Sequence, residues 1–132
     1  MATDVVRASW ITVAIARDPA LVRTVRLVAA AVARRSSDDE EFVEEVRLAA
    51  GEACALLIGA GHTEDEPVTV RLNVDSRLRV EVRSEGPAAP QDGISGDVDG
   101  VEPWLLLRGL VDDFSLTQDG PRTIVSMSWP VP

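Results

Sequence analysis

A carboxylate beside an apolar stripe is the first feature of the sequence that could do chemistry. The segment EVRLAAGEACALLIGAG, residues 45–61, has the composition of a helix, and Glu52 lies at the edge of its apolar face. A carboxylate placed there can act as a general base if it borders a working site. Leu56 follows one turn later, where a polar partner would share that face. This pair indicates either a catalytic helix or one that has lost its chemistry.

Other reactive side chains have simpler interpretations. Cys54 lies next to the core stripe, and without a suitably spaced histidine it is interpreted as a small buried hydrophobic residue. His62, the only histidine, is expected in a solvated loop, because one histidine with nearby acids makes a poor metal site. The aspartates of the 86–100 segment lack the ligand spacing of a calcium loop and are expected to be solvated; they are Asp92, Asp97 and Asp99.

The charge balance limits the classes of partner. The chain has 132 residues with a formal net charge of −9, and every basic residue is an arginine. Catalytic or phosphate-binding lysines are therefore excluded, and an acidic surface disfavours direct binding of nucleic acid and favours a basic protein face. No apolar run approaches the roughly 20 residues of a membrane span. The N-terminal residues do not resemble a signal peptide, so a cytoplasmic location is expected.

The elements that must position these residues are read from periodicity. A strand is expected over 8–16, a helix opened by Asp18 and Pro19, and a second helix from 37 to about 60. In the second helix, Ser37 and Glu40 have capping-box spacing. Its predicted buried positions are Phe42, Val46, Ala49, Ala50, Ala53 and Leu57.

The rest of the chain predicts two hairpins and one more helix. Period-two segments surround the turn at 75–76, and a final hairpin turns at 119–120. A helix with Pro103 in its first turn lies between them, after a long Gly- and Pro-rich stretch that is expected to be a flexible lid loop over 86–101. The order β-α-α-β-β-loop-α-β-β predicts one domain over 1–132 of the α+β class. We expect a two-layer α/β sandwich whose mixed, mostly antiparallel sheet is covered on one face by helices.

This order, with VRLAAGEACALLIGAG ahead of VEVRSEGP and a late LLLRGLVDDFSL, resembles the RsbW-type anti-sigma factors of the GHKL ATPase superfamily. The likeness extends to TIVSMSWPVP, which resembles the closing strand of that family. RLAxxEAC is its most specific piece. The resemblance implies a GHKL (Bergerat-type) fold in a bacterial protein, commonly a dimer, that sequesters a sigma factor. Many members also phosphorylate a serine of a STAS-domain antagonist with ATP and magnesium.

The resemblance also implies which residues would handle nucleotide. Glu52 matches the family's base, but Leu56 replaces an asparagine that binds magnesium, and an aliphatic side chain cannot ligate a hard cation. Ser84-Glu85-Gly86 stands where the family has Asp-x-Gly, whose aspartate binds the adenine amino group. Ser84 and Gly86 are thus remnants of a cofactor site, and no metal ligand is expected at position 56.

The second glycine box of the family is also altered. It is Gly-x-Gly-Leu, and the aligned residues here are Val101-Glu102-Pro103-Trp104. Proline has no N–H to offer a phosphate, and Glu102 would repel one. Gly100 lies one residue early, so a shifted alignment recovers one glycine only. Trp104 either fills the space of the nucleotide or packs in the core.

The sequence therefore predicts an anti-sigma factor without ATP-dependent kinase activity, released by a STAS-domain antagonist and needing no cofactor. One alternative is a divergent serine kinase that uses Mg-ATP, with Glu52 as base and Ser84 and Gly86 holding the nucleotide. A third is an interaction module with unrelated partners. A homodimer is implied by the resemblance alone.

Overall fold

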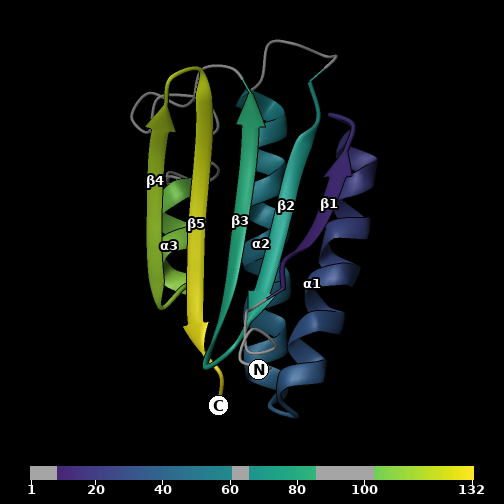
Figure 1. The fold of residues 1–132 in the computed structure, drawn as a ribbon, viewed down its shortest axis with the longest axis vertical. Coiled ribbons are helices and arrows are strands. Elements are labelled where there is room, and N and C mark those ends of the chain that lie inside the picture. The colour runs from purple at the N-terminus through teal and green to yellow at the C-terminus, as the bar shows by residue number, and fades with distance from the viewer. Residues whose placement is uncertain (1–8, 61–65, 86–102) are drawn as a thin grey trace, which may run out of the picture.

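A computed structural model describes residues 9–60, 66–85 and 103–132 (Figure 1). The order of elements agrees with the sequence-based expectation. The strands are β1 Ile11–Ile15, β2 Val68–Val74, β3 Arg77–Glu85, β4 Asp113–Asp119 and β5 Arg122–Pro130. The helices are the short 3-10 helix η2 Pro19–Leu21, α1 Val22–Ser36, α2 Glu40–Ala60 and α3 Pro103–Leu110.

The described strands form one sheet in the order β1-β2-β3-β5-β4. All four neighbouring pairs are antiparallel. Helices α1, α2 and α3 lie side by side on one face of this sheet, and the other face is open (Figure 1). The expected two-layer α+β architecture is confirmed, and among the described strands no parallel pair occurs.

The start of the first helical segment follows its sequence signals. Asp18 caps η2 by accepting a hydrogen bond from the Ala20 N–H at 3.0 Å, and Pro19 takes the first helical position. Of the expected α1 stripe, Val25 and Val32 are buried, while Leu21 and Val28 pack against the core from its edge.

Helix α2 begins two residues later than the capping-box spacing predicted. Asp39 is the capping residue: its carboxylate accepts from the N–H groups of Glu41 and Phe42 at 3.0 and 3.1 Å. Ser37 instead accepts from the Asp39 N–H at 3.0 Å and so shapes the turn before the helix. A carboxylate caps as well as a hydroxyl, and its charge suits the helix dipole. All six predicted core positions of α2 are buried.

Both predicted hairpins are present. Asp75 lies in the turn of the first hairpin, and its carboxylate accepts a hydrogen bond from the Arg77 N–H at 2.9 Å. The second turn contains Gly120 with φ of 61°, in the left-handed region that glycine adopts without steric cost.

The core lies between the helices and the inner face of the sheet. Along β3 and β5 the burial alternates residue by residue, as expected for strands with one covered face. Trp104 of α3 is 1% exposed, and its ring lies 6.4 Å from that of Phe114. Within the described residues, no helix has the length and apolar character needed to cross a membrane.

Candidate functional site

The residues singled out from the sequence lie around the C-terminal half of α2 and the end of β3. Glu52 and Leu56 are four residues apart on α2, so they share one helix face, and both are half-buried. Leu56 packs against the hydrophobic core. Glu52 forms no ion pair among the described residues. This helix face therefore offers one carboxylate and no second oxygen ligand at position 56.

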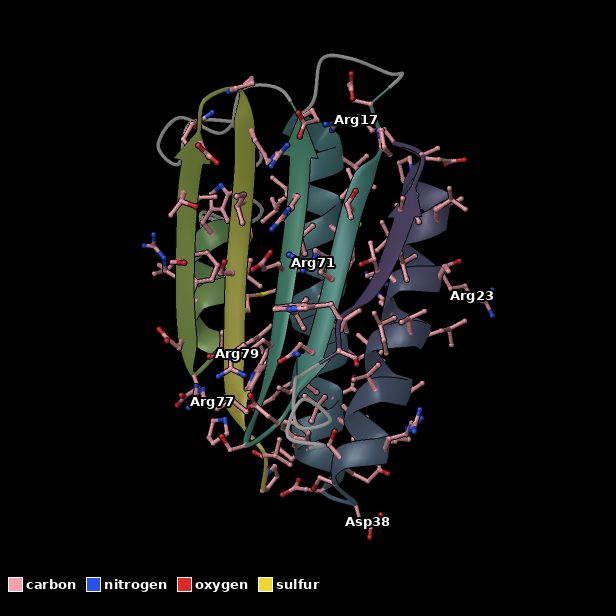
Figure 2. The ribbon with its side chains drawn as sticks, in the orientation of Figure 1. Arg17, Arg23, Asp38, Arg71, Arg77 and Arg79 are labelled. Carbon is pink, nitrogen blue, oxygen red and sulfur yellow. The ribbon has the colours of Figure 1, made fainter. Side chains whose placement is uncertain are left out.

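Ser84, which the family resemblance aligns with an adenine-binding position, is hydrogen-bonded by a side chain of the protein itself. The Arg17 guanidinium donates to the Ser84 hydroxyl and, at 3.0 Å, to the Glu85 carbonyl. Its other amino group donates to the Leu57 carbonyl at 2.7 Å. Arg17 follows β1 and thus joins three segments that are far apart in the sequence; Figure 2 shows it beside the end of β3.

This contact set has a clear electrostatic basis. The last carbonyls of a helix have no partner within the helix, and they carry the negative end of its dipole. A guanidinium at the end of α2 supplies donors and positive charge there. Ser84 is only 5% exposed, and its hydroxyl donates to the Glu85 carbonyl at 3.2 Å. Arg17 thus stabilises a junction that would otherwise bury unpaired polar groups.

The same arrangement is unsuited to an adenine. The adenine amino group is a donor and needs an acceptor, whereas a guanidinium carries only donors. The Ser84 oxygen already accepts from Arg17. An adenine amino group directed at the Ser84 oxygen would compete with the Arg17 guanidinium for it. Contacts within the chain therefore use the Ser84 hydroxyl and the Leu57 and Glu85 carbonyls, while the buried Arg17 Nε finds no partner among the described residues.

The start of α3 is also unsuited to phosphate. Pro103 is its first residue and has no N–H, and Trp104 behind it is fully buried. The Trp104 indole N–H finds no hydrogen-bond partner among the described residues. Both interpretations of Trp104, core packing and occupation of nucleotide space, remain compatible with this burial. Gly86, Gly100, Glu102 and the lid loop 86–101 lie outside the described residues.

The remaining reactive groups do not build a second site. Burial raises the pKa of the Cys54 thiol to about 11, although the nearby Arg26 charge opposes the shift. Such a thiol is not a nucleophile near neutral pH, as its position beside the core stripe predicted. In the described part of the chain, no three His, Cys, Asp or Glu side chains form a group suited to a metal ion. His62 and the aspartates of the 86–100 segment lie outside it.

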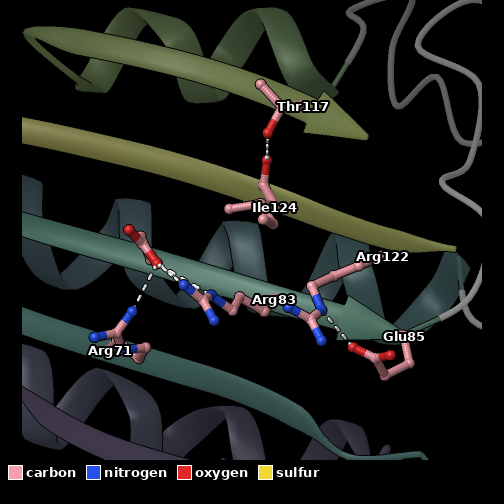
Figure 3. A network of polar contacts seen from close by, with 7 residues as sticks. Arg71, Arg83, Glu85, Thr117, Arg122 and Ile124 are labelled. Carbon is pink, nitrogen blue, oxygen red and sulfur yellow. Dashed lines mark hydrogen bonds and ion pairs between the residues drawn. The ribbon is translucent and has the colours of Figure 1, made fainter. Parts of the chain in front are cut away.

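The open face of the sheet carries paired charges. Glu81 accepts from Arg83 at 2.9 Å and lies 3.4 Å from Arg71, and Arg122 donates to Glu85 at 2.7 Å (Figure 3). Arg71 also lies under the Trp10 ring, 4.3 Å from its centroid. These partly exposed pairs keep a polar surface on the uncovered side of the sheet.

Arg17 was missed in the sequence because its partners are remote. They lie 40 to 68 residues away along the chain. The only local signal was an arginine between a strand and the helix-opening Asp18-Pro19, which is not specific.

Comparisons with known proteins agree on the fold. The model of the histidine kinase-like ATPase domain family matches residues 15–129. The structure is similar to that of the RsbU and RsbW domains of Rv1364c from Mycobacterium tuberculosis, with a TM-score of 0.72, 14% identity and coverage of 93% of this chain and 32% of that one. It is also similar to the histidine kinase domain of a blue-light activated kinase from Erythrobacter litoralis EL346, with a TM-score of 0.59, 20% identity and coverage of 84% and 61%.

The chain thus spans about a third of the first of these solved chains and three fifths of the second. No curated protein matches it.

Proposed function

The chain belongs to the histidine kinase-like ATPase domain family, and we propose that it acts within that family as a protein-binding regulator without kinase activity. Specifically, it would be a bacterial anti-sigma factor that sequesters a sigma factor and is released by a STAS-domain antagonist. The RsbW domain in one similar structure supports this assignment.

The occupation of Ser84 by Arg17 is the observation that carries the proposal. Phosphoryl transfer depends on positioning and charge neutralisation, so it needs a metal ligand, phosphate-binding amides and a binding site for the adenine ring. Here Leu56 stands at the position of the family's metal ligand, and the first residue of α3 is a proline. The Ser84 hydroxyl, at the position of the family's adenine-binding residue, accepts a hydrogen bond from Arg17. Loss of all three would leave partner binding as the working property of the domain.

Titration with Mg-ATP, followed by tryptophan emission, tests the absence of nucleotide binding. We expect no saturable change, because among the described residues position 56 offers no metal ligand and Pro103 offers no amide to a phosphate. A parallel reaction with labelled ATP and a STAS-domain protein is expected to transfer no label. Micromolar binding together with labelled serine would instead establish the divergent serine kinase.

A Glu52→Gln variant is the matched control for the labelling reaction. Glu52 is the only retained candidate base, so true kinase activity of this chain would fall with its removal. Label that persists in the variant would come from a contaminating kinase. Partner identity is tested separately by capture from a bacterial extract, and recovery of neither a sigma factor nor a STAS-domain protein would favour the unrelated interaction module.

A further inference from the structure

A groove of about 510 Å³ lies at the opposite end of α2 from Arg17. It is lined by the first residues of α2, the end of α3 and the end of β5. Figure 2 shows the two ends, with Arg17 at one and Asp38, just before α2, at the other. The lining residues of α2 stop at Glu45, and Arg17 binds the carbonyl of Leu57. At 1.5 Å per residue the two places are on the order of 20 Å apart.

The lining of this groove is mixed, with more polar than apolar surface, and its apolar part is named here the floor. Phe42, Val111, Trp129 and Pro130 contribute to it. The Trp129 indole N–H donates to the Leu110 carbonyl at 3.0 Å, so its donor is already used. An apolar side chain that enters the groove can contact this apolar part of the lining without removing the partner of the Trp129 N–H.

The rim of the groove is acidic. Asp39, Glu41, Glu45 and Asp112 line it, and none of the described lining residues is basic. Asp39 caps α2, and Asp112 is paired with Arg77 at 2.6 Å. Glu41 and Glu45 form no ion pair with any described side chain. They lie four residues apart on one helix face, so two carboxylates without an ion-pair partner lie on the same side of the groove.

We propose that this groove docks a basic amphipathic segment of a protein partner. One apolar side chain of the segment would fill the floor, and flanking arginines or lysines would pair with Glu41 and Glu45. A net charge of −9 opposes nucleic acids and anionic membranes as occupants and favours a basic peptide. The inference rests on the proposed function only in that the chain works by binding a protein.

The probe is a fluorescein-labelled helical peptide of about 15 residues, with one leucine flanked by arginines at i−4 and i+4. Fluorescence anisotropy on the full chain is expected to show saturable binding. The variant Glu41→Gln/Glu45→Gln is expected to bind about tenfold or more weakly, because it keeps side-chain shape and removes only the two charges. Rising salt should weaken the wild type more than this variant.

Glu40→Gln/Glu44→Gln is the matched control. It changes the net charge by the same amount, in the same turns of α2, at residues that do not line the groove. Each variant also loses one first-turn carboxylate, but the control in addition breaks the Arg34–Glu40 and Arg47–Glu44 pairs, so the unfolding midpoint of both variants is measured beside the affinity. We expect the control to lose no more than about twofold in affinity. Equal losses in both variants, or no saturable binding to the wild type, would overturn the proposal.

Two further outcomes are separable. Self-association of the chain that disappears in Glu41→Gln/Glu45→Gln would make a second copy the occupant and refute a foreign partner. Capture of neither a sigma factor nor a STAS-domain protein would refute the proposed function while leaving the peptide result intact.

Discussion

Replacing Arg17 by alanine tests whether the junction between α2 and β3 depends on the guanidinium. Arg17 donates to the Leu57 carbonyl at 2.7 Å, to the Glu85 carbonyl at 3.0 Å and to the Ser84 hydroxyl. Hydrogen bonds from a charged donor contribute about 1.5–3 kcal/mol each when buried. Arg17 is half-buried, so water replaces part of this. We expect Arg17→Ala to lower the free energy of unfolding by about 2 kcal/mol.

Urea unfolding followed by far-UV circular dichroism measures this change. Arg17→Lys is the control, because it keeps the charge and loses the fork that reaches two segments at once. It should recover less than half of the lost stability. A double-mutant cycle with Ser84→Ala isolates the bond to the hydroxyl, and we expect a coupling energy of about 1 kcal/mol.

Two results would refute the reasoning. One is an Arg17→Ala variant within about 0.5 kcal/mol of the wild type, which is the range of an ordinary surface substitution. The other is a coupling energy near zero between Arg17 and Ser84. Either would mean that the guanidinium does not hold the site closed, and the case against nucleotide would rest on Leu56 and Pro103 alone.

Three other predictions concern single residues. Cys54, with its pKa raised to about 11 by burial, should react with a thiol reagent at pH 8 only as fast as the protein unfolds. Gly120→Ala should lower the free energy of unfolding, measured by thermal unfolding, by about 1 kcal/mol, because φ at this position is 61°. Gly120→Asn should lower it less. Hydrogen bonds from the Arg77 N–H and the Arg79 guanidinium lower the pKa of Asp75 below its ordinary value of 3.8. The ionised Asp75 carboxylate therefore stabilises the fold fully above pH 3.8, and this stabilisation is lost as the pH falls through the lower pKa of the folded state. Asp75→Asn should therefore be less stable than wild type at pH 7 and equally stable in strong acid.

Local patterns were enough to predict most of the fold. Alternation of period two located both hairpins, and the spacing of apolar residues identified six of the buried positions of α2, although Val43 is buried as well. These signals are local because one strand face or helix stripe must be buried whatever lies opposite. The start of α2 was less certain, since Ser37 and Asp39 can both cap a helix and only the backbone path decides between them.

The candidate site was only half predictable. The Glu52 and Leu56 spacing follows from helix geometry, so their common face was expected. Arg17 could not be found in this way, because its partners belong to the ends of α2 and β3, which only the folded sheet brings to β1. The acidic groove likewise requires α2, α3 and β5 together.

The two ends of α2 differ in how their polar groups are used. At the C-terminal end, Arg17 satisfies the carbonyls and the Ser84 hydroxyl within the chain, so binding there must first break existing bonds. At the N-terminal end, Glu41 and Glu45 have no described ion-pair partner, so a basic ligand gains contacts without displacing any. A ligand is favoured where it adds contacts and disfavoured where it replaces them. This difference supports the proposal that α2 binds a basic protein segment at its N-terminal end.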